Sequence, residues 1–503
     1  MDSVDLSRLQ FGVTALYHFL FVPLTLGLSF ILAIMESVYV MTKNPIWKDM
    51  TKYWGILFGI NFAMGVATGV PLEFQFGTNW SYYSHYVGDV FGSLLAIEGL
   101  MAFFLEATFI GLFYFGWDRL TPIKHLMCTW LLALGTNFSA LWILVANAWM
   151  QNPIGSAFNI ETMRMEMTSF YDVFFNPVAQ SKFVHTVSAG YVAGSMFVLS
   201  ISAYFLLKNR HIGFAKRSMT VAASFGLASA LSVVVLGDES GYVLTENQRM
   251  KIAAIEAMWE TEPAPAALTL FGIPNEETKI INYKVAIPWL LGIITTRSFN
   301  QPVYGINDLV KHSEENIKEG IKAYSALEIL RKNKNDTVAK KLFDEHGKHL
   351  GYALLLKKIR PDIQNATEQE IKDTAKITVP KIKPLFFSFR IMVGLGIYFI
   401  LLFGVAFYIS ARHRIGENKT FLKFAKYSLP LPWVAIELGW YIAETGRQPW
   451  TIDGILPTFL SASDISATSV WISLTMFVVF YTILLIVDLF LMRKYIKLGP
   501  TLS

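Results

Sequence analysis

Long runs of apolar residues separated by short polar connections dominate the pattern of the 503-residue chain. A helix needs about 20 such residues to cross the ~30 Å hydrocarbon core of a bilayer. The pattern therefore predicts an all-α integral membrane protein with nine transmembrane helices. They cover residues 12–41, 54–76, 91–117, 126–150, 184–207, 218–237, 385–409, 424–444 and 470–492.

One long polar segment interrupts this pattern between the sixth and seventh helices. We therefore divide the chain into helices one to six (1–237), a large loop (238–383) and helices seven to nine (384–503). Within the loop, residues 308–350 have the spacing of an amphipathic helix with a solvated charged face. In the first part, 237–266, charged, aromatic and proline residues alternate. This part is either a substrate-binding flap or merely a polar stretch.

The positions of Lys and Arg predict the orientation, because short cytoplasmic connections are enriched in these residues. Seventeen Lys and Arg residues lie in one set of connections and only four in the alternate set. The long loop is left out of this count, because long loops follow the rule poorly. The N-terminus and the long loop are therefore expected outside, and the C-terminus in the cytoplasm. The larger set occupies residues 43–52, 119–124, 208–217, 412–426 and 493–497.

Composition agrees with a membrane protein and narrows the chemistry. Hydrophobic residues make up 53% of the chain and charged residues only 16%, and the net charge of +5 follows from the topology rather than indicating a nucleic-acid partner. A single cysteine, Cys128, excludes an internal disulfide, a CxxCH haem attachment and a thiolate-held iron–sulfur cluster. Redox chemistry would need other ligands.

Ionisable side chains in a bilayer are costly, so each one inside a predicted helix is a candidate functional residue. They are His18, Glu98, Glu106, His185 and Glu444. All except Glu106 are expected in the outer half of the membrane, as is Met392, which suits a common cofactor cluster. Each also has a simpler interpretation: the histidines can bond a neighbouring helix, and Met392 can be a packing residue.

Glu98 and Glu106 are eight residues apart in the third predicted helix. In an α-helix this places them about 12 Å apart along the axis and about 80° apart around it. That spacing suits two steps of a proton relay, but it equally suits two unrelated carboxylates. The periodicity leaves both interpretations open.

Cations accompany two of the candidates. Arg390 precedes Met392 by two residues, and Arg447 follows Glu444 by three. A guanidinium at such a place can pair with a haem propionate while the neighbouring side chain reaches the iron. Only two histidines lie well within predicted helices, which is too few for a haem–copper oxidase, so a site with several haems would have to use Met or Glu.

Several long motifs resemble one known family along nearly the whole chain. They include LSRLQFGVTALYHFLFVP (6–23), EFQFGTNWSYYSHYVGDVFG (73–92), IEGLMAFFLEATFIGLFYFGWDRL (97–120), SALWILVANAWMQNP (139–153), KFVHT (182–186), GDESGY (237–242), FRIMVG (389–394) and GWYIAETGRQPW (439–450). The sequence resembles subunit I of the cytochrome bd quinol oxidases, in the subgroup with a long loop. The family fold has nine helices and an external quinol-binding loop between helices six and seven, as expected above.

The resemblance implies a role for each candidate. His185 and Met392 would be the axial ligands of a low-spin haem b, and His18, Glu98 and Glu444 would serve a high-spin haem b and a haem d. Lys251 and Glu256 match residues implicated in quinol oxidation. Glu106 matches a carboxylate of a cytoplasmic proton path, and Trp440 and Arg447 would shape the haem site. How the two high-spin haems divide their three ligands is open.

The implied activity is that of a terminal oxidase in the bacterial inner membrane. Quinol, either ubiquinol or menaquinol, would be oxidised outside, and dioxygen would be reduced to water with cytoplasmic protons, without a pump. The resemblance also implies a second membrane subunit and one or more very small single-helix accessory subunits. An ion transporter that uses the membrane carboxylates is the alternative from another class, and a subunit that has lost its cofactors is a third.

Overall fold

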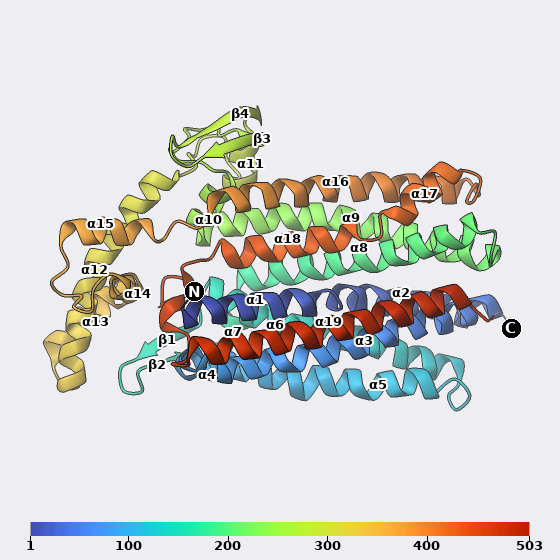
Figure 1. Ribbon diagram of the computed structural model, residues 1–503, viewed down its shortest axis with the longest axis horizontal. Coiled ribbons are helices and arrows are strands. Elements are labelled where there is room, and N and C mark those ends of the chain that lie inside the picture. The colour runs from blue at the N-terminus through green and yellow to red at the C-terminus, as the bar shows by residue number, and fades with distance from the viewer. Residues whose placement is uncertain (1, 502–503) are drawn as a thin grey trace.

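The structure of the protein is a computed structural model that describes residues 2–501. In this part of the chain, eight helices are long and apolar enough to cross a membrane, and they lie side by side in one bundle (Figure 1). Their bounds are Ser3–Thr42, Pro45–Thr78, Ser81–Phe115, Pro122–Gln151, Phe170–Leu207, Ile212–Asn247, Ile382–Ala411 and Ala467–Leu498. The chain is a multi-pass membrane protein.

Three of these spans are interrupted. The first consists of α1 (Ser3–Phe19) and α2 (Val22–Thr42), and the fifth of α7 (Phe170–Phe174) and α8 (Pro177–Leu207). The third consists of α4 (Ser81–Ile97), a π-helix (Glu98–Phe103) and α5 (Phe104–Phe115). The continuous spans are α3 (Pro45–Thr78), α6 (Pro122–Gln151), α9 (Ile212–Asn247), α16 (Ile382–Ala411) and α19 (Ala467–Leu498).

The predicted eighth span, 424–444, is divided in the structure. It comprises the end of α17 (Lys419–Tyr427) and then α18 (Leu431–Thr445), with Pro430 between them. At 15 residues, α18 is about 22 Å long, shorter than a typical hydrocarbon core. It nevertheless lies within the bundle, against α8 and α16. The ninth membrane span therefore remains a prediction.

The expectation of an all-helical chain was wrong in detail, because the structure contains three antiparallel hairpins. They pair β1 (Ser156–Asn159) with β2 (Arg164–Met167), β3 (Leu268–Asn275) with β4 (Ile280–Ile287), and β5 (Trp450–Ile452) with β6 (Leu456–Pro457). All three lie in connections outside the long helices. The fold is mostly helical.

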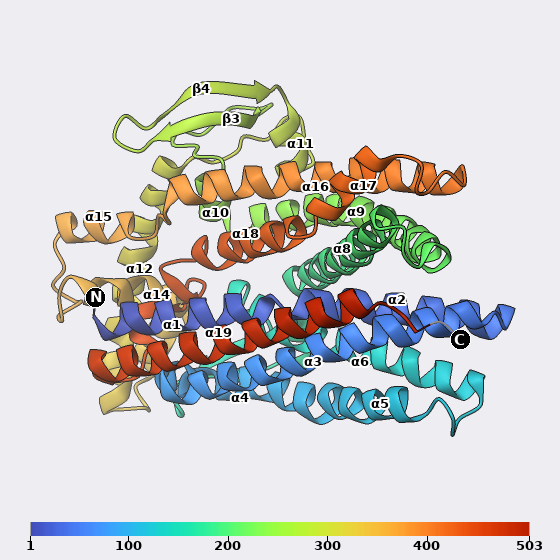
Figure 2. The same cartoon turned by 45° about the vertical axis from the view of Figure 1, so that its right-hand side comes forward.

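Helix α9 continues beyond the predicted end of its membrane segment, through the polar GDESGY motif to Asn247. The predicted amphipathic helix over 308–350 forms as α12 (Ile306–Lys332) and α13 (Thr337–His346), followed by further short helices. Figures 1 and 2 show this part of the loop at the end of the bundle that carries the N-terminus, which we call the loop-side end. The remaining loop helices are α10 (Arg249–Ile255), α11 (Leu290–Thr296), α14 (Leu350–Leu354) and α15 (Glu368–Lys376).

The centre of the bundle is α8, which packs against α2, α6 and α9. Glycines allow the backbones of α2 and α8 to approach each other closely. A Cβ atom placed on Gly27 of α2 would lie 2.4 Å from the carbonyl oxygen of Gly190 in α8, so only glycine permits this approach. Close backbone packing through small residues is a common way for membrane helices to associate.

Candidate functional site

His18 lies at the end of α1, where the first span is interrupted. Its Nδ1 atom is 3.0 Å from the Thr68 hydroxyl, and a Cβ atom on the neighbouring Gly69 would lie 3.1 Å from the imidazole Cε1. At the interruption the Leu20 carbonyl accepts a hydrogen bond from the Trp433 indole (2.7 Å), and the Phe21 carbonyl accepts one from the Asn61 amide (2.7 Å) besides that from the Thr25 N–H. The break is therefore a defined structure that fixes the backbone beside His18.

His185 and Met392 lie on α8 and α16, which both pack against α9. Each faces a glycine. A Cβ atom on Gly237 of α9 would lie 3.2 Å from the His185 Cε1 atom, and one on Gly439 of α18 would lie 3.3 Å from the Met392 sulfur. The Nδ1 atom of His185 is buried and makes no hydrogen bond with the described residues.

Glu444, at the end of α18, belongs to a cluster of charged and amide side chains. Its carboxylate accepts hydrogen bonds from Arg447 and from Asn147 (3.0 Å), and the Lys182 ammonium is 3.9 Å away. Lys182 also lies over the ring of Trp440, 5.1 Å from its centre. The structure thus brings together Trp440, Glu444 and Arg447, which the sequence assigned to one site.

The ring of Trp440 also connects this cluster to the first span. Its edge-on contact with Phe19 has a centroid distance of 5.0 Å, and Phe19 directly follows His18. Helices α1 and α18 are therefore in contact at the level of His18 and Trp440. The contact places the end of α1 beside the residues of α18 that precede Glu444.

The predicted spacing of Glu98 and Glu106 was wrong, because Glu98–Phe103 is a π-helix and ideal α-helical geometry does not apply. Glu98 accepts a 2.6 Å hydrogen bond from Ser139 of α6. Glu106 is buried against α6: a Cβ atom on Gly135 of α6 would lie 3.2 Å from the Glu106 Cγ atom. Ser139 and Gly135 are four residues apart, so the two acids contact α6 at points only about 6 Å apart along its axis.

Lys251 is buried and points into the bundle from α10. Its ammonium donates to Gln248 (2.6 Å), to Gln151 (3.2 Å) and to the carbonyl of Ala443 (3.0 Å), which is adjacent to Glu444. Burial lowers the pKa of Lys251 to about 7. This lysine is part of the polar cluster around Glu444 rather than of the loop surface.

Glu256 directly follows α10 and points to a different set of residues. Its carboxylate accepts a 3.0 Å hydrogen bond from Arg390, whose guanidinium also donates to the carbonyls of Ile255, Phe386 and Thr269. Burial raises the pKa of Glu256, and the charge of Arg390 opposes that shift. Arg390 is thus largely occupied by protein groups, although its Nε atom is buried without a partner among the described residues.

A cavity of about 200 Å³ opens beside Glu256, between the segment 256–262 that follows α10 and the β3–β4 hairpin. Trp259, Thr269, Lys284 and Leu291 contribute to its walls, but Lys251 does not. Lys251 and Glu256 were expected to meet one head group together. In the described part of the chain they share no hydrogen-bond partner.

Sequence reasoning missed several ionisable residues inside the helices. Both carboxylate oxygens of Glu437 in α18, and one of Asp488 in α19, are buried without a hydrogen-bond partner among the described residues. Glu36 and His125 form a buried pair with a 2.6 Å contact. Each is a single charged or titratable residue inside an apolar helix, and this signal could have identified them.

The donor set suits haem better than a bare metal ion. Among residues 2–501 no three His, Cys, Asp or Glu side chains gather closely enough to hold an ion. Instead, single donors of nitrogen, sulfur or carboxylate type lie on different helices, and three of them, His18, His185 and Met392, face glycines. Haem iron needs only one or two axial ligands, and a flat macrocycle needs space beside them, so these residues fit such a group.

Comparison with known proteins covers almost the entire chain. Residues 6–500 match the family described as cytochrome bd terminal oxidase subunit I. The chain is 49% identical over 500 residues to cytochrome bd-II ubiquinol oxidase subunit 1 of Escherichia coli, covering 99% of this chain and 97% of the relative. It is 37% identical to cytochrome bd ubiquinol oxidase subunit 1 of Bacillus subtilis, covering 99% and 94%. In fold, it is similar to the bd oxidase of Geobacillus thermodenitrificans, with a TM-score of 0.80, 24% identity and 99% coverage of both chains.

Proposed function

Because the chain belongs to the cytochrome bd terminal oxidase subunit I family, we propose that it oxidises quinol at the outer face of the bacterial cytoplasmic membrane and reduces dioxygen to water within that membrane. It is a quinol:oxygen oxidoreductase of the bd type. Two relatives are named ubiquinol oxidases and a third a menaquinol oxidase, so the family relation leaves the choice of quinone open. The haems, when bound, supply electron transfer and the site of oxygen reduction.

We assign the haem ligands residue by residue. His185 and Met392 would hold a low-spin haem b, while His18, Glu98 and Glu444 would serve a high-spin haem b and a haem d. The glycines opposite His18, His185 and Met392 support this assignment, since they leave room beside each donor. Arg447 and Trp440 would position Glu444. The Nε atoms of Arg390 and Arg447 have no hydrogen-bond partner among residues 2–501 and are available to anionic haem substituents.

Quinol oxidation is proposed at the cavity beside Glu256. One observation carries this proposal: the Glu256 carboxylate is bonded at 3.0 Å to Arg390, which lies two residues before Met392 in α16. An acid that accepts quinol protons is thereby connected directly to the helix that carries a low-spin haem ligand. Lys251, whose ammonium lies inside the bundle in the cluster around Glu444, would stabilise negative charge near that carboxylate.

Protons for water formation are proposed to pass from the cytoplasm through Glu106 to Glu98. The short separation of their contacts on α6 supports transfer between them, since proton relays need neighbouring groups. Quinol protons would leave on the opposite side, so charge would cross the membrane without a pump. This requires the N-terminus and long loop outside and the C-terminus inside, as the positive-inside rule predicts.

The enzyme is expected to function in a complex. The relatives are named as subunit 1 or I, which implies other oxidase subunits. We propose a heterodimeric core with subunit II and one or more single-helix accessory subunits. Quinol, dioxygen and the lipid bilayer complete the set of partners.

The test is Glu256→Gln in the purified complex, with Glu315→Gln in the exposed part of α12 as the matched control. Glutamine keeps the shape of the side chain but cannot take up a quinol proton, so quinol oxidation should fall by about 10²-fold or more. The reduced-minus-oxidised haem spectrum should remain that of the wild type. Normal quinol turnover in Glu256→Gln would overturn this assignment.

A further inference from the structure

The β3–β4 hairpin and the adjacent α11 carry a group of exposed apolar side chains outside the long helices. Phe271 is 56% exposed, Val285 55%, Trp289 59% and Phe299 63%. We call the exposed apolar side chains of residues 268–273 and 283–299 the apolar base of the hairpin. So many large apolar residues on a water-facing loop would be unfavourable, and such a patch usually marks an interaction surface.

The position of α11 shows at what depth this surface lies. Arg297, at its end, pairs with Asp238 (2.6 Å) and Glu239 (3.2 Å) of α9. Ile294 of α11 also lies close to α9, since it would be 3.7 Å from a Cβ atom on Gly241 of that helix. The predicted membrane segment of α9 ends at residue 237, so α11 lies at the level where α9 leaves the hydrocarbon.

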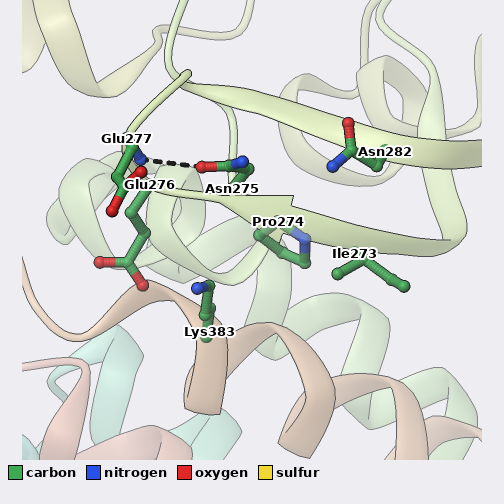
Figure 3. A pocket seen from close by; sticks show the side chains of 7 residues that line it. All are labelled: Ile273, Pro274, Asn275, Glu276, Glu277, Asn282 and Lys383. Atoms are coloured by element: carbon green, nitrogen blue, oxygen red, sulfur yellow. Dashed lines mark hydrogen bonds between the residues drawn. The ribbon is translucent and has the colours of Figure 1, made fainter.

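The hairpin is oriented along α16. The carbonyl of Thr269, near the start of β3, accepts a 2.8 Å hydrogen bond from Arg390. At the other end of the strand, an open cavity of about 520 Å³ lies between the hairpin tip and Lys383 in the first turn of α16, as Figure 3 shows. Figures 1 and 2 both show β3 and β4 beside the loop-side part of α16.

Polarity changes along the hairpin in the direction of the membrane. The polar side chains Asn275, Glu276 and Glu277 lie at the tip that faces Lys383 (Figure 3), where Ile280 is also exposed, whereas the base at the level of Arg390 carries the exposed Phe271 and Val285. This gradient matches a water–lipid boundary, with a tryptophan, Trp289, where interfacial tryptophans are enriched. A protein partner would not require polarity to follow the depth of α16.

The exposed surface of α16, which lies beside the hairpin, is apolar as well. Phe387, Ile391 and Ile397 of that helix are 39%, 50% and 55% exposed. We propose that the apolar base lies in the outer interfacial layer of the bilayer, beside α16. The occupant of this surface is lipid.

This placement has a consequence for the substrate, which rests on the function proposed above. Other side chains of the same hairpin, Thr269, Ile281 and Lys284, line the Glu256 cavity. One element therefore separates lipid from the proposed quinol site. A quinol dissolved in the bilayer reaches Glu256 past the apolar base without crossing water.

The test of the lipid contact does not depend on enzyme activity. In a Cys128→Ser background, Phe271→Cys would be labelled with a bimane fluorophore in the complete complex, reconstituted into vesicles of brominated phosphatidylcholine. Val338→Cys, at an exposed position of α13, is the control for a water-facing site. The signal of the background without an added cysteine is subtracted.

We expect brominated lipid to quench the label at 271 and not at 338, and aqueous iodide to do the reverse. Quenching at 271 by iodide alone would show that the base faces water. Protection from both quenchers would show that protein covers it. Either result overturns the proposal.

A second measurement tests the quinol route. In Phe271→Ser/Val285→Ser, the KM for a long-tailed quinol should rise several-fold, while the KM for a short-tailed, water-soluble quinol and the haem spectrum should not change. If brominated lipid quenches the label at 271 but both KM values stay at wild-type level, the lipid contact holds and the quinol route is wrong.

Discussion

Gly237 lies so close to the imidazole of His185 that a Cβ atom at position 237 would be 3.2 Å from the ring carbon Cε1. A side chain at position 237 of α9 would therefore require this histidine ring to move by a few tenths of an ångström. Since α8 and α9 are packed along their lengths, neither backbone can easily move apart. The position of the His185 ring is therefore sensitive to a single added methyl group.

Gly237→Ala should displace the His185 ring and shift or reduce the low-spin haem signal. Alanine favours the helix over glycine, so the change should not unfold α9. The measurement is a reduced-minus-oxidised spectrum of the purified complex. Gly241→Ala is the control, because its added Cβ would meet only Ile294, at an ordinary 3.7 Å. Equal spectra for both variants would contradict the proposed role of His185.

Met392→Leu should also remove the low-spin signal, since leucine preserves volume but supplies no sulfur for iron. The protein should still insert, because Met392 contributes apolar contacts that leucine can replace. Met41→Leu, at an exposed site at the end of α2, is the matched control. If the low-spin spectrum survives in Met392→Leu, the sulfur is a packing group.

Glu106→Gln should slow oxygen reduction by about 10²-fold and leave quinol able to reduce the low-spin haem. Glutamine fits beside Gly135 but cannot pass a proton to Glu98. The measurements are oxygen consumption and stopped-flow haem reduction. Glu106→Asp keeps an acid and should restore part of the rate. Oxygen consumption at the wild-type rate in Glu106→Gln would exclude this carboxylate from the relay.

Lys251 should make stability depend on pH. Its pKa is lowered from 10.5 to about 7 by burial, so above pH 7 the folded protein loses this proton while the unfolded chain keeps it. The free energy of unfolding should therefore rise with pH between 7 and 10.5, by about 1.4 kcal/mol per pH unit from this group. Below pH 7 the contribution should be constant.

The measurement is the melting temperature of the detergent-solubilised complex between pH 6.5 and pH 9. The difference between the wild type and Lys251→Met should change with pH in the direction given, favouring the wild type as pH rises. Lys284→Met, which removes a partly exposed amine, is the control. A pH-independent difference for Lys251→Met would show that the amine keeps its proton in the folded protein.

The second half of the long loop should position the hairpin that follows Arg447. A Cβ atom on Gly351 of α14 would lie 2.2 Å from the carbonyl oxygen of Gly454, and Tyr352 packs against Trp450 with ring centres 5.1 Å apart. Gly351→Ala must therefore push the β5–β6 hairpin away. We expect a shifted high-spin haem spectrum through Arg447 and Glu444, with the low-spin haem intact. Val338→Ala, in the same half of the loop, should leave both spectra unchanged.

The sequence predicted the long helices well because a bilayer imposes an apolar length that can be read locally. Contacts between helices cannot be read in this way. The π-helix at Glu98 and the break after His18 depend on partners such as Ser139 and Trp433 that lie far away in the chain. The family resemblance assigned both Lys251 and Glu256 to quinol oxidation, yet in the structure they contact different neighbours.

The missed residues have a similar origin. Glu437 and Asp488 lie within apolar runs whose average hydropathy hides a single acid. The β3–β4 hairpin was not predicted because its apolar residues belong to a loop that is polar on average. Family resemblance supplied the candidate ligands, whereas the glycines at 69, 237 and 439 that leave room for them are visible only in three dimensions.

The π-helix uncouples the register of Glu98 and Glu106 from the number of residues between them. A π-turn holds one residue more than the α-helical turn it replaces, so deleting a single residue from 99–103 would let α4 and α5 merge into one continuous α-helix. Both kinds of turn complete one rotation, so the angle between Glu98 and Glu106 about the helix axis would hardly change, whereas the same deletion in the regular α-helical part at 104–105 would rotate Glu98 by about 100° relative to Glu106. A one-residue deletion within the π-helix should therefore be better tolerated by catalysis than a one-residue deletion directly after it.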